Sequence, residues 1–186
     1  MSFALLFLCT GNRCRSPFAA ALMEQRLGDH DVIVRSAGLL PGGEATPAEG
    51  IRVGSEYRID LTPHVSRHFT RELADDADLV LTMTNSEARE VVTSHPDSWP
   101  RVFTVKSFVR WLGGQDVPAA GVSRSWLEQA GAPRTPHELL GAHADDEVED
   151  PFGRSARTWR RVATELSDAV DRVVAAMPVR SGLPVR

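Results

Sequence analysis

Cysteine is scarce in this chain, which has two cysteines, Cys9 and Cys14, among its 186 residues. Two thiols are too few for a disulfide scaffold, a four-cysteine zinc site or an iron–sulfur cluster. The chemistry of these thiols must therefore be deduced from the residues around them.

Long hydrophobic runs and an excess of positive charge are also missing. No segment approaches the roughly eighteen apolar residues of a membrane span, and the run from Phe3 to Leu8 is too short for a signal peptide. The 21 basic and 25 acidic residues give a net charge of −4, which disfavours a nucleic-acid binder and a polybasic membrane protein. We therefore expect a cytoplasmic protein with reduced thiols and with neither a nucleic-acid nor a membrane partner.

Length and composition indicate one globular domain. The chain is 42% hydrophobic and 25% charged, and its length is that of a single domain. Glycines and prolines interrupt the stretch at about 108–149, which we interpret as an insertion or lid. We predict one domain over 1–178 that contains this insertion, followed by a flexible tail over 179–186.

The chain alternates apolar runs with segments of helical character. Strands are predicted over 3–8, 31–36, 78–83 and 101–105, and helices over 16–27, about 46–57, 86–93 and 155–177. Pro17 is expected at the first helical position, which proline favours. This alternation predicts an α/β fold in which helices cover both faces of a doubly wound parallel sheet. Ligands bind at the carboxyl ends of such strands, where Cys9 lies.

Cys9 and Arg15 match the pattern C-x5-R, which is weak evidence in a chain with 20 arginines. The context strengthens the pattern, because the cysteine ends a buried strand, a tight polar loop follows, and a helix begins directly after it. Backbone N–H groups and the positive end of the helix dipole then form a nest for a tetrahedral oxyanion, and Arg15 can bind two of its oxygens. The same field favours the Cys9 thiolate, a prepared nucleophile. In the alternative interpretation, Cys9 is a buried hydrophobe and Arg15 a surface charge.

The segment from Leu6 to Pro17, LFLCTGNRCRSP, resembles the signature loop of the low-molecular-weight protein tyrosine phosphatases. The similarity continues in four shorter motifs, which are SAG ending at Gly38, HVS ending at Ser66, DLVLTM ending at Met83 and DPF ending at Phe152. The resemblance implies a three-layer α/β sandwich with helices on both faces of a four-stranded parallel sheet of strand order 2-1-3-4. It also implies a phosphorylated protein as substrate, inorganic phosphate as product, and no metal or other cofactor.

The resemblance also assigns roles within the loop. Cys9 would attack phosphorus and form a phosphocysteine, which water then hydrolyses, while Arg15 and the loop amides hold the oxygens. Ser16 would donate a hydrogen bond to the Cys9 thiolate, and Asn12 would hold the loop with help from Ser36. The predicted phosphate-binding loop consists of Thr10, Gly11, Asn12, Arg13, Cys14, Arg15 and Ser16.

An acid must protonate the leaving group from the side of the phosphate that is opposite the thiolate. The acidic cluster before the last helix offers five candidates, Asp145, Asp146, Glu147, Glu149 and Asp150, any of which could instead be a solvated loop charge. Asp150 is predicted to be the acid, because Pro151 stiffens the backbone directly after it and the Asp-Pro pair of the family aligns there. The same carboxylate would then activate the water.

Cys14 and two histidines have alternative interpretations. Cys14 either forms a reversible disulfide with Cys9 that protects the nucleophile from over-oxidation, or is a small packed residue. His64 and His68 are spaced like some metal ligands, but no acidic third ligand is evident beside them. We interpret both histidines as structural and predict no metal site.

Arg13 departs from the family pattern. Tyrosine-specific members usually have an apolar residue at this place, and the related protein arginine phosphatases have threonine. An arginine would repel a substrate guanidinium, which favours phosphotyrosine. By contrast, the motifs CTGN, FTVK ending at Lys106 and DPFG ending at Gly153 are more similar to the arginine-phosphatase branch.

We therefore expect a cysteine-dependent phosphatase that hydrolyses phosphotyrosine in proteins, with a protein arginine phosphatase as the alternative. An arsenate reductase on the same fold would need two further cysteines, and no cysteine follows Cys14. A non-catalytic phosphate-binding module is disfavoured because Cys9, Arg15 and Asp150 are all present.

Overall fold

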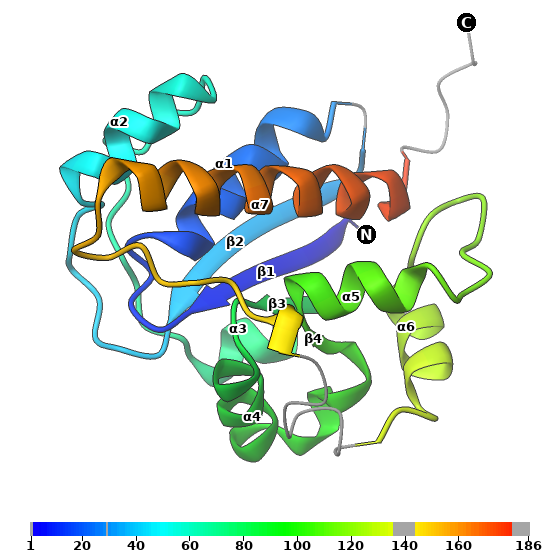
Figure 1. Ribbon diagram of the computed structural model, residues 1–186. Coiled ribbons are helices and arrows are strands. Elements are labelled where there is room, and N and C mark those ends of the chain that lie inside the picture. The colour runs from blue at the N-terminus through cyan, green and yellow to red at the C-terminus, as the bar shows by residue number, and fades with distance from the viewer. Residues whose placement is uncertain (1, 29, 136–143, 180–186) are drawn as a thin grey trace, which may run out of the picture.

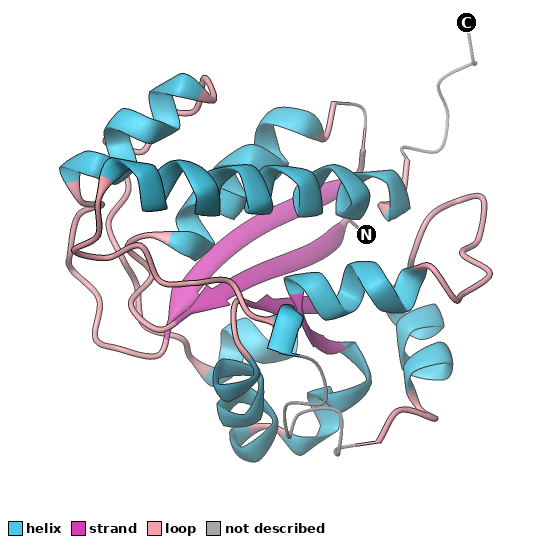
Figure 2. Ribbon diagram, viewed as in Figure 1, coloured by secondary structure: helices cyan, strands magenta, loops and turns pink. Residues whose placement is uncertain are grey.

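The computed structural model describes residues 2–28, 30–135 and 144–179. Its centre is one parallel sheet of four strands in the order β2-β1-β3-β4 (Figures 1 and 2). The strands are β1 (Phe3–Cys9), β2 (Val32–Gly38), β3 (Leu79–Thr82) and β4 (Val102–Thr104). The predicted fold class and strand order are confirmed.

Helices cover both faces of this sheet. In the described residues, the α-helices are α1 (Arg15–Arg26), α2 (Ala48–Glu56), α3 (Arg71–Asp76), α4 (Asn85–Ser94), α5 (Val105–Leu112), α6 (Arg124–Gly131) and α7 (Ala156–Ala176). Short 3₁₀ helices span Pro96–Arg101 and Ala144–Asp146. Figure 1 shows α1, α5 and α7 on one side of the strands and α3 and α4 on the other. Among the described residues, no helix combines the length and the apolar character that crossing a membrane requires.

Each face of the sheet has its own hydrophobic core. Leu5 and Phe7 of β1 pack with residues of α1, α5 and α7, whereas Leu6 and Leu8 pack with residues of α3 and α4. Successive side chains of a strand point to opposite faces, so a continuously apolar strand is the pattern of a sheet buried on both sides. This is why the run from Phe3 to Leu8 predicted the central strand.

The structure corrects several element boundaries. Helix α1 begins at Arg15, so Pro17 is its third residue rather than its first. Proline is tolerated there because the first four N–H groups of a helix have no partner within the helix. Strand β2 continues to Gly38, beyond the predicted end at Ser36. The short helix α3 was not predicted, although the Thr70 side chain caps it.

The first residues of the stretch 108–149 belong to helix α5 (Val105–Leu112) and pack against the sheet. Helix α5 follows β4 directly, and Phe108 is buried with its ring 5.1 Å from that of Phe103. The ring centroid of Trp111 lies 4.9 Å from that of Phe103 and 5.4 Å from that of Trp126 of α6. One aromatic cluster therefore joins β4, α5 and α6. Residues 136–143 of this stretch, and 180–186 of the tail, lie outside the described residues.

Candidate active site

The loop between β1 and α1 curls around the Cys9 sulfur at the carboxyl end of the sheet. Cys9 is the last residue of β1 and is buried. The Asn12 backbone N–H donates to Cys9 Sγ at 3.2 Å, and Ser16 Oγ lies 3.1 Å from the same sulfur. A serine hydroxyl and a backbone N–H at these distances stabilise a thiolate, because each can donate a hydrogen bond to the negative charge.

Asn12 connects this loop to the neighbouring segments. Its amide donates to Ser16 Oγ at 3.0 Å and to Ser36 Oγ at 2.9 Å, and its side-chain oxygen accepts from the Arg67 backbone N–H at 2.9 Å. The Asn12 carbonyl accepts from His64 Nε2 at 2.7 Å. Asn12 has a φ of 50°, a left-handed conformation that asparagine tolerates better than most residues. These hydrogen bonds hold the conformation on which the loop depends.

Gly38 lies beside the loop because it pairs in register with Cys9. A Cβ at this position would be 2.7 Å from the Asn12 nitrogen and 2.8 Å from the Gly11 carbonyl carbon. Both are backbone atoms of the loop, so relief of the clash requires the loop to move.

We expect Gly38→Ala to lower the affinity for inorganic phosphate by roughly tenfold or more and to lower the free energy of unfolding by about 1–3 kcal/mol. Calorimetric titration with phosphate and thermal unfolding measure the two effects. Gly114→Ala is the matched control, since its Cβ would make only an ordinary contact at 3.7 Å. Wild-type phosphate affinity in Gly38→Ala would contradict this prediction.

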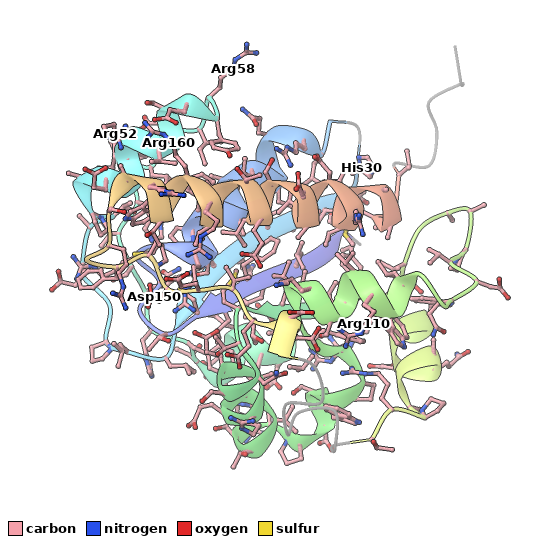
Figure 3. The ribbon with its side chains drawn as sticks, viewed as in Figure 1. His30, Arg52, Arg58, Arg110, Asp150 and Arg160 are labelled. Carbon is pink, nitrogen blue, oxygen red and sulfur yellow. The ribbon has the colours of Figure 1, made fainter. Side chains whose placement is uncertain are left out.

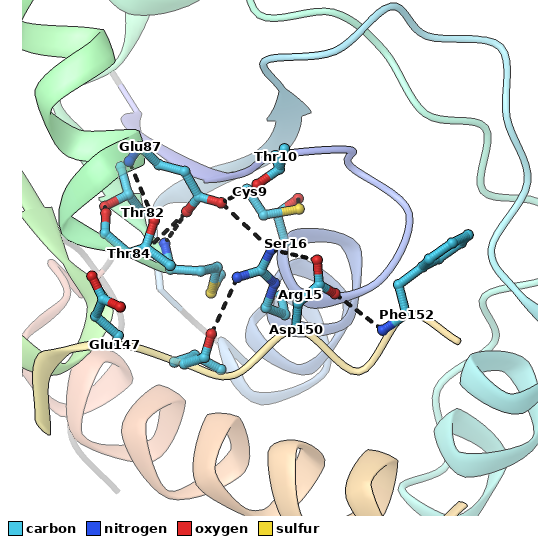
Figure 4. Close-up of polar contacts among 12 residues, drawn as sticks. Cys9, Thr10, Arg15, Ser16, Thr82, Thr84, Glu87, Glu147, Asp150 and Phe152 are labelled. Atoms are coloured by element: carbon cyan, nitrogen blue, oxygen red, sulfur yellow. Dashed lines mark hydrogen bonds and ion pairs between the residues drawn. The ribbon is translucent and has the colours of Figure 1, made fainter. Parts of the chain in front are cut away.

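Arg15 is a buried cation whose side chain is 3% exposed. Its Nη1 donates to the Val148 carbonyl at 3.1 Å, and its Nη2 donates to Asp150 Oδ2 at 3.0 Å (Figure 4). Its Nε is buried without a hydrogen-bond partner among the described residues. A phosphate oxygen in the loop would be a suitable acceptor for this donor, since arginine binds phosphate through adjacent N–H groups.

Asp150 differs from its four acidic neighbours in position. It lines the same pocket as Cys9, and its side chain is 50% exposed. Its other oxygen, Oδ1, accepts from the Phe152 backbone N–H at 3.1 Å. Among the neighbours, Asp146 pairs with Arg110 of α5, an arginine that Figure 3 shows away from Asp150. Glu149 pairs with Arg161 of α7. Asp150 is therefore the member of the acidic cluster that lines the pocket with Cys9, and its role as the acid stays a prediction.

The pocket has a volume of about 170 Å³ and combines polar and apolar walls. It is lined by Cys9, Thr10, Gly11, Arg13, Cys14, Arg15, Leu40, Asp150 and Phe152. Leu40 was not anticipated from the sequence. The described residues of the stretch 108–149 do not contribute to this lining, and a lid role for that stretch stays a prediction.

The two cysteines have different environments. Both are free thiols. Burial, reinforced by the charges of Asp150 and Cys9, raises the pKa of the Cys14 thiol to about 12. Cys14 is therefore protonated at neutral pH and is a poor nucleophile. A reversible disulfide with Cys9 stays a hypothesis, and the packing of Cys14 against the core favours the alternative role of a small buried residue.

Arg13 lies at the rim of the pocket with three partners of its own. Its Nε donates to the Ala45 carbonyl at 3.1 Å, its Nη2 is 3.7 Å from Glu44 Oε2, and its guanidinium lies over the Phe152 ring at 4.9 Å. The Phe152 ring is exposed and forms part of the pocket wall. These contacts hold the Arg13 charge at the side of the pocket.

Glu87 is a residue near the site that sequence reasoning missed. Its carboxylate is 3% exposed and accepts from Thr10 Oγ1 at 2.8 Å. The sequence signal was the spacing T-x-x-E from Thr84 to Glu87, which predicts a helix start but no contact with a distant loop.

The comparisons with known proteins agree with this geometry. Residues 4–120 match the family model described as low molecular weight phosphotyrosine protein phosphatase. The chain is 34% identical to the protein-arginine-phosphatase of Bacillus subtilis over 88% of this chain and 89% of the relative. It is 31% identical to the low molecular weight protein-tyrosine-phosphatase Etp of Escherichia coli over 62% of this chain and 75% of the relative.

The fold has close structural relatives as well. The crystal structure of a low molecular weight protein tyrosine phosphatase from T. tengcongensis superposes with a TM-score of 0.70 at 30% identity, covering 94% of this chain and 99% of its own. The chain therefore belongs to the low molecular weight phosphotyrosine protein phosphatase family and is a phosphatase acting on phosphorylated proteins.

Proposed function

We propose that this phosphatase hydrolyses phosphoarginine in proteins through a phosphocysteine intermediate. The observation that carries this substrate class is the sequence match to the Bacillus subtilis protein-arginine-phosphatase, which covers most of both chains, whereas the sequence match to the Escherichia coli tyrosine phosphatase covers a smaller part. Superposition of structures does not separate the two classes, since the tyrosine phosphatase of T. tengcongensis also covers 94% of this chain. The loop, Arg15 and Asp150 support the reaction itself, because they bring a nucleophile, an anion-binding cation and an acid to one pocket.

The position of Arg13 weakens the argument for phosphotyrosine. That argument rests on repulsion between Arg13 and a substrate guanidinium. In the structure, the Arg13 guanidinium lies over the Phe152 ring, and Glu44 is an oppositely charged neighbour. The pair with Glu44 is exposed and contributes little energy by itself, but it offsets part of the positive charge at the rim.

The first step of the proposed reaction is attack by the Cys9 thiolate on phosphorus. An S–P bond forms as the P–N bond to the substrate guanidino nitrogen breaks. Arg15 and the loop N–H groups stabilise the phosphoryl oxygens, and protonated Asp150 gives its proton to the leaving nitrogen. In the free enzyme Asp150 accepts from Arg15 Nη2, so a bound phosphoryl group competes with this carboxylate for the arginine.

The second step releases phosphate. A water molecule attacks phosphorus of the phosphocysteine, and Asp150, now a carboxylate, takes a proton from that water. The S–P bond breaks and leaves inorganic phosphate and the Cys9 thiolate. Ser16 Oγ, 3.1 Å from the sulfur, is placed to donate a hydrogen bond to this leaving thiolate.

Phosphotyrosine is the second candidate substrate, and one observation favours it. The Arg13 guanidinium and the Phe152 ring both line the pocket, and each can stack against a phenyl ring. A wall with two such planar groups suits the ring of a tyrosine side chain.

Two peptides of one sequence, one with phosphoarginine and one with phosphotyrosine, separate these candidates. We expect the wild-type protein to have the higher kcat/KM on the phosphoarginine peptide. Arg13→Thr is expected to raise kcat/KM on phosphoarginine by roughly three- to tenfold, because it removes a positive charge near the substrate guanidinium. Its effect on phosphotyrosine is expected to be smaller or of opposite sign.

Arg71→Thr is the matched control, since Arg71 is an exposed arginine of α3 that does not line the pocket. It is expected to leave both kcat/KM values within about twofold of wild type, as surface charges outside the site do little. A wild-type preference for the phosphotyrosine peptide would replace our proposal with the second candidate.

A further inference from the structure

Glu87 is a charged residue in a place where charge is costly. It lies in the first turn of α4 and is 3% exposed, yet it does not line the catalytic pocket. A buried carboxylate is unfavourable unless hydrogen bonds or an opposite charge compensate for its lost hydration. Its partners therefore indicate what the side chain does.

The two oxygens of Glu87 contact two different parts of the molecule. Oε2 accepts from the backbone N–H groups of Met83 at 2.9 Å and Thr84 at 3.0 Å, which completes the cap of α4. Oε1 accepts from Thr10 Oγ1 at 2.8 Å and lies 3.5 Å from Arg15 Nη2 (Figure 4). The cap alone would explain Oε2, but it does not require Oε1 to face the phosphate-binding loop.

Thr10 and Arg15 lie at opposite ends of this loop. Thr10 directly follows the nucleophile, and Arg15 begins α1. One buried carboxylate thus contacts both ends of the loop and anchors them to α4, across the sheet from α1. Helix α4 begins directly after the short turn that follows β3, so the anchor is tied to the sheet.

Arg15 has a second carboxylate partner, Asp150, which is much more exposed to solvent than Glu87. Asp150 is half exposed and contacts the same Nη2 atom at 3.0 Å. In the proposed reaction Asp150 must give up this contact to reach the leaving group, whereas Glu87 is buried and stays in place. Arg15 would then keep one fixed anion beside it while its other donors turn to the phosphoryl oxygens.

We propose that Glu87 is a positioning residue that fixes Arg15 and Thr10 so that the loop is preformed for a phosphoryl group. The inference rests on the phosphoryl chemistry of the proposed function but not on the choice of phosphoarginine over phosphotyrosine. Preorganised donors bind an oxyanion more tightly because they are not reoriented when it arrives.

Glu87→Gln tests the proposal with almost no change of shape. If the glutamine oxygen caps α4, its amide N–H₂ faces Thr10 and Arg15, which are themselves donors at this contact. If the amide is reversed, the cap is lost instead. We expect the affinity for inorganic phosphate, measured by calorimetric titration well below the unfolding temperature, to fall roughly tenfold, in line with loss of a charge-assisted contact. We expect kcat/KM to fall by a similar factor.

Glu90→Gln is the matched control, because Glu90 is an exposed glutamate on the same helix. A capping role alone would lower the unfolding temperature of Glu87→Gln and leave phosphate affinity and kcat/KM within about twofold of wild type, and that result would overturn the proposal. Phosphate titration needs no substrate, so it tests Glu87 even if the peptide comparison rejects the proposed substrate.

A second pair of variants keeps the test decisive if Glu87→Gln does not fold. Thr10→Val removes the hydroxyl that donates to Glu87 Oε1 and leaves the cap of α4 intact. Thr10→Ser retains that hydroxyl. We expect Thr10→Val to weaken phosphate binding several-fold and Thr10→Ser to restore most of it. Equal phosphate affinities in these two variants would contradict the proposed anchor.

Discussion

Cys9→Ser is expected to abolish phosphatase turnover, lowering kcat by roughly a thousandfold or more, while inorganic phosphate still binds. A serine hydroxyl is not ionised at neutral pH, so it supplies no anionic nucleophile for attack on phosphorus. The groups that hold the phosphoryl oxygens are retained, since Arg15 makes its hydrogen bonds to Val148 and Asp150 without the sulfur. The serine hydroxyl can accept the Asn12 backbone N–H that now donates to the sulfur. Steady-state kinetics on an aryl phosphate and calorimetric titration with phosphate measure the two quantities.

Alkylation provides an independent control on the same thiol. Iodoacetamide reacts with thiolates, so at neutral pH we expect modification of Cys9 and protection by inorganic phosphate. Cys14 is expected to stay unmodified in the folded protein, because burial raises the pKa of its thiol to about 12. Mass spectrometry of the labelled protein distinguishes the two sites. Turnover at the wild-type rate in Cys9→Ser would refute the covalent mechanism.

Asp150→Asn is expected to lower kcat on substrates with poor leaving groups by roughly a hundred- to ten-thousandfold. Asparagine has almost the same shape and can still accept a hydrogen bond from Arg15, but it cannot protonate the leaving group or take a proton from water. The loss should shrink on an aryl phosphate whose leaving group departs without a proton. Kinetics on a series of aryl phosphates, each measured across pH, check both expectations.

Asp145→Asn is the matched control for this series. Asp145 belongs to the same acidic cluster but lines a different groove, with Lys106 and Arg110 of α5. It is expected to leave kcat within about twofold of wild type. If Asp150→Asn retains the wild-type pH–rate profile and leaving-group dependence, another group is the acid.

Local sequence patterns were sufficient to predict much of the fold. The apolar run of β1 identified a strand buried on both faces, because period-two alternation is lost only when neither face meets solvent. The boundaries were less accurate. Helix α1 begins two residues before the predicted first position at Pro17, since the whole first turn, and not only its first position, tolerates a residue without an N–H group.

In the candidate site, some residues could be predicted from local sequence and others could not. The loop from Thr10 to Ser16 is local in sequence, so its residue types and spacing suffice to indicate an oxyanion nest. Asp150 is distant along the chain, and it was predicted from the proline that follows it and from the Asp-Pro pair of the family, neither of which indicates a contact with Arg15. The structure places it 3.0 Å from Arg15, a contact that depends on how the segment before α7 returns across the sheet.

By itself, the sequence therefore determined the alternating parallel fold, the loop with its nucleophile and cation, and a short set of acidic candidates. Only the tertiary structure decided which acid reaches the pocket, how Arg13 is held against Phe152, and that Glu87 contacts Thr10, 77 positions away in the chain. The physical reason is the separation along the chain over which each interaction acts. Strand and loop propensities act between neighbours in sequence, whereas the direction and burial of a charge depend on residues that only the packed fold brings together.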